Sequence, residues 1–262
     1  MNPEISFASA SVPPDLVPYV RSLQGARLRG GAPARQLELP VAGTAVIVEL
    51  TERWEIGVRD GTPLVGHRSF AGGLTLGPAV SAHRGAYELV EFVLTPLGTV
   101  AVLGLPPVEI TDEVVAFDAL LGAEAERLGE RLAACAHWGG RFAETERWLR
   151  ARVAASRALV SPDVGWALRR LDATGGRLRI GELQRELGCS RRHLATRFAA
   201  GVGVTPKRYA QLVRFGEAVT RLRAGAAPGE VAAGCGYADQ AHLTREVRRF
   251  GATTPGGLRA DG

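Results

Sequence analysis

The sequence GYADQAHLTREVRRFGATTP, residues 236–255, nearly repeats an earlier stretch of the same chain. Residues 188–206 read GCSRRHLATRFAAGVGVTP, and a His-Leu pair and a Thr-Pro pair recur at the same offset of 49 residues. Each stretch begins with a glycine and ends at Thr-Pro. A chain that contains one small unit twice, at a fixed spacing, is expected to build two similar substructures that act together.

The first copy predicts a helix, a short turn and a second helix. Ile180, Leu183 and Leu187 recur at the spacing of one helical face. Gly188 suits the left-handed residue that ends such a helix. Ser190 is the expected N-cap of the second helix, because its hydroxyl can accept a backbone hydrogen bond. Two helices joined by a short, glycine-containing turn are the helix-turn-helix pattern.

The second copy follows the same pattern, with Gly236 in the turn and Asp239 as the N-cap. A long helix from Pro206 to near Gly225 is expected to connect the copies and to hold them at a fixed spacing. The residues predicted to face inward are Leu194 and Phe198 in the first copy, Tyr209, Leu212, Val213, Val219 and Leu222 in the connecting helix, and Val231, Ala232, Cys235, Leu243, Val247 and Phe250 in the second copy.

The outward faces of the two second helices carry short residues and arginine. Glutamine can bond adenine bidentately, arginine can bond guanine, and threonine can contact a thymine methyl group. The N-terminal part of such a helix enters the major groove, and two helices about 34 Å apart would fit successive grooves. The predicted DNA-binding residues are Ser190, Arg191, Arg192, Ala195, Thr196 and Ala199 in the first copy, and Gln240, Ala241, Thr244, Arg245 and Arg248 in the second.

Charge is divided unevenly along the chain. Residues 160–262 carry 16 Arg and one Lys against nine Asp and Glu, a net charge of +8, whereas residues 1–159 have a net charge of −3. A basic C-terminal third indicates a polyanionic partner.

Residues 160–262 resemble the DNA-binding domain of the AraC/XylS transcription regulators. The most specific part of the resemblance is Gly236-Tyr-Ala-Asp-Gln-Ala-His-Leu-Thr-Arg245, with Arg249-Phe-Gly251, Thr254-Pro255 and Leu258-Arg259 after it. The chain departs from the family at four positions. The family usually has a large aromatic residue where this chain has Val247, often has one where it has Leu243, and often has polar residues in place of Ala195 and Ala241.

Residues 1–110 predict a small β-barrel or sandwich, because several short β-type runs are separated by turn residues. The expected strands are Thr44–Leu50, Trp54–Arg59, Ala86–Leu94 and Thr99–Leu103, with a hairpin turn at Asp60-Gly61 and an early helix near Asp15–Leu23.

The family resemblance extends more weakly to this region, through the motifs Pro18-Tyr-Val20, Gly77-Pro78 and Leu94-Thr-Pro-Leu-Gly98. It implies a cupin-like β-barrel that senses a small molecule or dimerises.

The expected fold class is therefore α+β, with a change of pattern after residue 110. Helical periodicity runs from Thr111 to Ala134 with a break at Gly122, and again from Arg141 to Ala155, after Gly139-Gly140. The expected organisation is a β-rich cupin-like sensor domain over residues 1–110, a helical linker over 111–159, and an AraC-type double helix-turn-helix domain over 160–262.

Other chemistries find little support in the sequence. His67 and His83 are the only histidines in the first 110 residues, and neither lies in a metal-binding pattern. The three cysteines have no zinc or redox spacing and suit the cytoplasm. The sequence predicts no cofactor and no enzymatic activity. The alternative is a ligand-binding or metal-dependent enzymatic cupin-like protein with a vestigial DNA-binding domain.

The expected partners follow from the favoured interpretation, a sequence-specific transcription regulator. They are double-stranded DNA at a promoter or operator, a small-molecule effector, RNA polymerase and a second copy of the chain.

Overall fold

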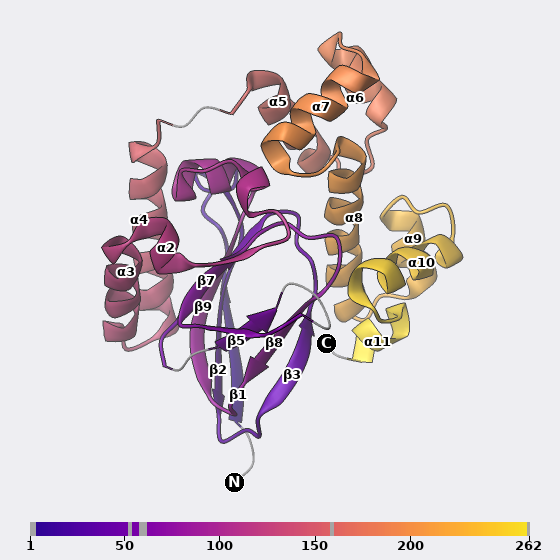
Figure 1. Cartoon of the computed structure of the whole chain (residues 1–262). Coiled ribbons are helices and arrows are strands. Elements are labelled where there is room, and N and C mark those ends of the chain that lie inside the picture. Colours follow the sequence, from indigo (N-terminus) through magenta and orange to yellow (C-terminus); the bar gives the residue numbers. More distant parts are fainter. Residues whose placement is uncertain (1–3, 52–53, 58–61, 158–159, 261–262) are drawn as a thin grey trace. The chain divides into compact units, whose positions relative to one another are not determined.

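The structure is a computed structural model, and it describes residues 4–51, 54–57, 62–157 and 160–260. The chain divides into two compact units. The first unit comprises residues 1–37, 43–74 and 79–159, and the second comprises residues 38–42, 75–78 and 160–262. Figure 1 shows the strands of the first unit in indigo to magenta, and the helices of the second unit in salmon pink through orange to yellow.

A six-stranded antiparallel sheet forms the centre of the first unit. Its strands, in spatial order, are β1 (Glu4–Ala10), β2 (Val20–Arg29), β9 (Tyr87–Leu94), β4 (Thr44–Glu49), β7 (Ser69–Gly72) and β10 (Val114–Ala116). The predicted strands at Thr44–Leu50 and Ala86–Leu94 are confirmed as β4 and β9. These two pair with each other near the middle of the sheet. Successive residues of a strand point to opposite faces of the sheet. Other elements of the first unit cover both faces of this sheet.

One face of this sheet packs against a second, four-stranded sheet. Its spatial order is β3 (Ala34–Glu38), β8 (Ala79–His83), β5 (Trp54–Gly57) and β6 (Val65–His67). Trp54 and Ile56 of β5 pack with Phe70 and Leu89 of the larger sheet in one buried cluster. Strand β5 confirms the start of the predicted Trp54–Arg59 strand. The expected hairpin at residues 60–61 lies outside the described residues.

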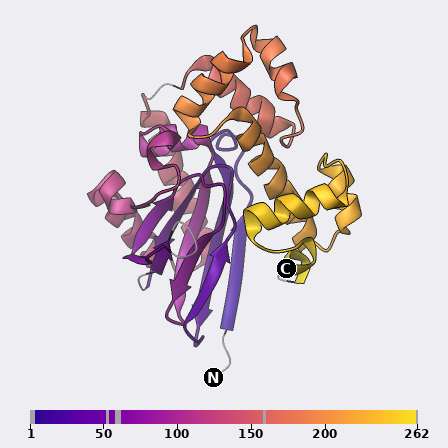
Figure 2. The same cartoon turned by 45° about the vertical axis from the view of Figure 1, so that its right-hand side comes forward.

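Helices cover the other face of the six-stranded sheet. They are α1 (Pro96–Gly98), η1 (Thr99–Leu103), η2 (Pro107–Ile110), α2 (Phe117–Leu121), α3 (Ala123–Ala134) and α4 (Trp138–Ala155). Phe117, Leu128 and Trp148 share a buried cluster with Val48 and Phe92 of the sheet. Figures 1 and 2 show α2, α3 and α4 beside the strands. Residues 117–155 thus form part of the core of the first unit, and the whole arrangement confirms the predicted α+β class.

Four local predictions for this unit are wrong. Residues 114–116 form strand β10, which pairs with β7, rather than the start of the helix predicted from Thr111. Residues 14–19 form turns rather than a helix, and a strand begins at Val20. Residues 99–103 are helical rather than extended, because tertiary burial of Val100 and Val102 outweighs the β preference of branched side chains. Gly139-Gly140 lies inside the first turn of α4, where Nδ1 of His137 accepts a hydrogen bond from the amide of Gly140 at 3.0 Å.

Two motifs that the family resemblance singled out contact each other. The hydroxyl of Thr95 donates to the carbonyl of Pro18 at 2.8 Å and accepts from the amide of Gly98 at 3.0 Å. A Cβ atom at Gly98 would lie only 1.9 Å from the carbonyl oxygen of Tyr19. Only glycine allows this close approach, which fixes the chain after β9 against the start of β2.

A half-buried arginine cluster joins α4 to the sheet. The guanidinium groups of Arg27 and Arg141 both bond the carboxylate of Glu88, and Arg141 also donates to the carbonyl of Leu132 at 3.2 Å. The same two guanidinium groups lie 5.6 and 4.8 Å from the ring centre of Trp138. Burial alone would raise the pKa of Glu88, but hydrogen bonds from Arg141 and Arg27 outweigh burial and hold the pKa below its usual range.

Because of this cluster, we expect the folded protein to lose stability in acid. Because the pKa of Glu88 is lower in the folded than in the unfolded chain, its contribution is present above the ordinary value of 4.5 and is lost as pH falls below it. We expect Glu88→Gln to lower the free energy of unfolding at neutral pH, with a gap to the unmodified protein that narrows as the pH falls below 4.5. Urea unfolding at a series of pH values measures this gap. A gap that stays constant with pH would contradict the expectation.

The second unit consists of helices packed around a long central one. They are α5 (Pro162–Ala173), α6 (Ile180–Leu187), α7 (Arg191–Val202), α8 (Pro206–Arg223), α9 (Pro228–Gly234), α10 (Gln240–Gly251) and α11 (Pro255–Ala260). Figures 1 and 2 both show α8 extending from the first helix-turn-helix unit, α6–α7, to the second, α9–α10.

The core of this unit contains nearly all of the residues predicted to face inward. Leu194, Phe198, Leu243, Val247 and Phe250 are at most 1% exposed. The exception is Val213, which is half-buried. Two fully buried residues of α8, Phe215 and Ala218, were not among the predicted core residues.

Candidate nucleic-acid interface

Both predicted recognition helices begin at the predicted N-caps. The hydroxyl of Ser190 accepts a hydrogen bond from the amide of His193 at 3.2 Å, and α7 starts at the next residue. The carboxylate of Asp239 accepts from the amide of His242 at 2.6 Å, and α10 starts at Gln240. These caps fix the residue at which each helix begins, and therefore which side chains its first turns present.

The turns before the two helices use glycine where a left-handed residue is required. Gly188 has φ +62° and Gly236 has φ +75°. A Cβ atom at Gly236 would also lie 3.0 Å from the side chain of Arg177. Both turns therefore match the sharp reversal that the repeated sequence predicts.

The structure places the predicted residues of α7 on its outer face. Ser190, Arg191, Arg192 and Thr196 are exposed, and Ala195 and Ala199 are half-buried. The opposite face is closed by Leu194 and Phe198. Arg197 is also exposed but pairs with Asp163 at 3.3 Å, so it helps to join α7 to α5.

Helix α10 presents an outer face of the same kind. Gln240, Ala241, Arg245 and Arg248 are exposed, and Thr244 is half-buried, with its hydroxyl donating to the carbonyl of Gln240 at 2.9 Å. The neighbouring Arg249 differs, because its guanidinium lies 5.1 Å from the ring centre of Phe250. In the part of the chain that the structure describes, the four outer-face arginines Arg191, Arg192, Arg245 and Arg248 make no ion pair.

Helix α8 supports both recognition helices through aromatic contacts. Phe198 of α7 packs edge-on against Tyr209 at 5.7 Å between ring centres, and Phe250 of α10 packs against Phe215 at 5.3 Å. The hydroxyl of Tyr209 also donates to the carboxylate of Asp172 at 2.9 Å. One continuous helix therefore fixes the positions of both outer faces.

A buried polar contact between α8 and α10 was not predicted. Glu246 is only 4% exposed. Its carboxylate accepts from Nε2 of Gln211 at 2.9 Å and from the guanidinium of Arg214 at 3.3 Å. Arg214 in turn lies 4.8 Å from the ring centre of Tyr237. The sequence contained one indication of this contact. Glu246 is the single acidic residue between Leu243 and Phe250, and it falls on the inner side of an otherwise basic helix.

The cap of α10 gives a direct test of this local geometry. We expect Asp239→Ala to cost about 0.5–2 kcal/mol of stability, because the amide of His242 loses its hydrogen-bond acceptor. Asp239→Asn keeps an acceptor at the same position and is the matched control. Urea unfolding followed by circular dichroism measures both variants. Equal losses in the two would show that the cap contributes through charge rather than through this hydrogen bond.

Comparison with known families identifies this unit. Residues 183–261 match the family described as a helix-turn-helix domain. Residues 183–261 form an AraC-type helix-turn-helix domain. The AraC-type assignment confirms the predicted DNA-binding transcription regulator and disfavours the alternative of a cupin-like enzyme with a vestigial DNA-binding part.

Solved structures extend the similarity in fold to nearly the whole chain. ToxT from Vibrio cholerae matches with a TM-score of 0.56 and 9% identity, over 92% of this chain and 98% of that one. Unsaturated fatty acid-bound wild-type ToxT from V. cholerae strain SCE256 matches with a TM-score of 0.53 and 8% identity, over 87% of this chain and 91% of that one. At these identities the likeness concerns the fold. The comparison with curated proteins found no match.

No helix among the described residues is both long and apolar enough to cross a membrane. No group of three or more His, Cys, Asp or Glu side chains among them is arranged to hold a metal ion.

Proposed function

We propose that this AraC-type regulator binds double-stranded DNA sequence-specifically, with the outer faces of α7 and α10 in successive major grooves. The observation that carries the proposal is the pair of capped helices on one rigid support. Each presents short polar side chains and arginines that, within the described residues, have no acidic partner. Such residues can reach base edges without a bulky apolar side chain in the way.

The two helices present different residue types to the DNA. In α10, Gln240 and Arg245 are the proposed readers of adenine and guanine edges, and Thr244 and Ala241 lie where a thymine methyl group would contact them. In α7, Arg191 and Arg192 lie in the first turn, where side chains reach bases or the adjoining phosphates. Ser190, Ala195, Thr196, Ala199 and Arg248 complete the proposed contact surface.

The first unit is proposed to control DNA binding in response to a small molecule. The similarity of fold to fatty acid-bound ToxT supports this role, because it shows that a protein of this architecture can accommodate a small ligand. Contacts with RNA polymerase and with a second copy of the chain are part of the same proposal, as are a cytoplasmic location and the lack of catalytic activity.

Footprinting of the full-length protein on its operator tests the arrangement of the two helices. Two protected major-groove segments are expected on one face of the duplex, about 10–10.5 base pairs apart from centre to centre. Protection of one segment, or of two segments on opposite faces of the duplex, would contradict the use of both helices by one chain.

A further inference from the structure

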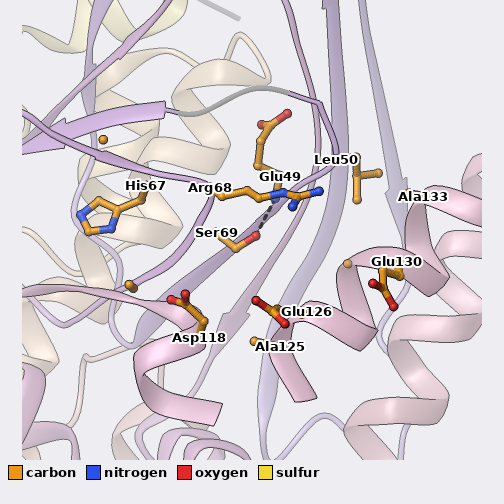
Figure 3. Close-up of a pocket in the computed structure, with 13 residues that line it drawn as sticks. Glu49, Leu50, His67, Arg68, Ser69, Asp118, Ala125, Glu126, Glu130 and Ala133 are labelled. Atoms are coloured by element: carbon orange, nitrogen blue, oxygen red, sulfur yellow. Dashed lines mark hydrogen bonds between the residues drawn. The ribbon is translucent and has the colours of Figure 1, made fainter. Parts of the chain in front are cut away.

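A cavity of about 580 Å³ lies in the first unit, between α3 and the segment that joins β6 to β7. Sites for small molecules in proteins typically measure about 300–1,000 Å³, so this cavity has room for one. Figure 3 shows His67, Arg68 and Ser69 on the strand side of the cavity, and Asp118, Glu126 and Glu130 on the helical side.

The charges that line the cavity are mostly negative. Asp118 on α2 and Glu126 and Glu130 on α3 are exposed carboxylates, and within the described residues none of the three makes an ion pair. Among the described residues that line the cavity, Arg68 is the one fully charged cation. Burial lowers the pKa of His67 and so favours the neutral imidazole, although Asp118 opposes this effect.

A fourth carboxylate at the cavity, that of Glu49, has a structural role. It is buried and accepts hydrogen bonds from the amide of Thr51 at 2.9 Å, from the hydroxyl of Thr51 at 2.7 Å and from the indole of Trp54 at 2.6 Å. The three carboxylates of α2 and α3 are therefore the groups left to meet a ligand.

Small residues keep the helical wall of the cavity open. Ala125, Gly129 and Ala133 follow one another at intervals of four along α3, so they share one face of the helix. A Cβ atom at Gly129 would meet only the side chain of Val48, at 3.9 Å. The wall thus leaves space for the apolar part of a ligand, with the carboxylates beside it.

We propose that this cavity binds a small organic cation, whose amine, amidine or guanidinium group lies against Asp118, Glu126 and Glu130. The inference rests on the proposed effector-binding role of the first unit and names the chemical class of the effector. Among the described residues of the lining, an anionic ligand would meet three carboxylates that make no ion pair and a single arginine to offset them, an arrangement that favours a cationic ligand over an anionic one.

Isothermal titration calorimetry on the full-length protein tests the charge preference. The probes are tryptamine, benzamidine and spermidine as cations, and indole-3-propionate, benzoate and oleate as anions. At least one cation is expected to bind, and more tightly than every anion. Binding of none of the cations, or tighter binding of an anion, would overturn the proposal.

Two variants locate the binding. The double variant Glu126→Gln, Glu130→Gln is expected to lower the affinity for the tightest-binding cation about tenfold, because each lost ion pair contributes modestly. Glu109→Gln with Glu113→Gln makes the same change of charge on exposed residues outside the cavity and is expected to leave the affinity unchanged. Equal weakening in both double variants would show non-specific attraction and overturn the assigned site.

A third variant fills the cavity without removing charge. Gly129→Leu is expected to abolish cation binding, and the fold is expected to persist because glycine is the weaker helix former. Unchanged cation binding in this variant would contradict the assigned site. DNA binding is measured separately: specific DNA binding without cation binding would refute only this inference, whereas cation binding without specific DNA binding would refute the proposed function.

Discussion

Replacing Arg245 with alanine is expected to weaken binding to the cognate operator by about 1–3 kcal/mol, roughly 5- to 150-fold. Arg245 is exposed on the outer face of α10, makes no ion pair within the described residues, and follows Gln240 by five residues. Because a base contact exists only on the matching sequence, affinity for random DNA is expected to fall much less. Fluorescence anisotropy with the two duplexes at one salt concentration measures both losses.

Arg249→Ala is the matched control for this experiment. Arg249 has the same charge and is also exposed on the same helix, but its guanidinium lies 5.1 Å from the ring centre of Phe250. The control is expected to change specific and random binding by similar, small amounts. If Arg245→Ala also lowered both affinities equally, Arg245 would contact phosphate and not a base.

Replacing Glu246 with alanine is expected to destabilise the second unit by about 3–5 kcal/mol. The change removes a carboxylate that is 4% exposed, and it leaves Arg214 and Gln211 without their acceptor inside the contact between α8 and α10. Removing one partner of a buried ion pair costs more than the pair itself contributes, because the remaining charge stays desolvated. Urea unfolding followed by circular dichroism measures the change.

Two further variants separate burial from charge. Glu230→Ala removes the same charge from an exposed position on α9 and is expected to change stability by less than about 0.5 kcal/mol. Arg214→Met combined with Glu246→Leu replaces both partners with apolar residues and is expected to recover much of the loss. A double variant as unstable as Glu246→Ala would refute the ion-pair explanation and assign the effect to packing alone.

The double helix-turn-helix could be predicted because its determinants are local. The caps at Ser190 and Asp239 and the turn glycine at Gly236 each act within a few residues of their own position. The buried positions repeat at helical spacing, so one pattern fixed both the helices and their inner faces. The residues of the outer faces could be predicted because they are the positions that remain once the buried ones are assigned. Their contacts with DNA are still predictions.

The first unit was harder to predict because distant segments determine its structure. Val100 and Val102 have branched side chains that favour strands, yet residues 99–103 are helical. The helical conformation buries both side chains between the helices and the sheet. The buried position of Glu246 likewise depends on Gln211, which is 35 residues away. The cavity combines residues 66–69 with residues on α2 and α3, and no local pattern in the sequence links these segments.

The central claim is sequence-specific recognition of DNA by the second unit. Its most direct test is the affinity of the full-length protein for the DNA upstream of its own gene, compared with a scrambled duplex of the same composition, at one stated salt concentration. A preference for the upstream duplex on the order of 10³ or more is expected. Equal affinity for both duplexes would mean that the basic outer faces bind only the phosphate backbone, and it would contradict the claim.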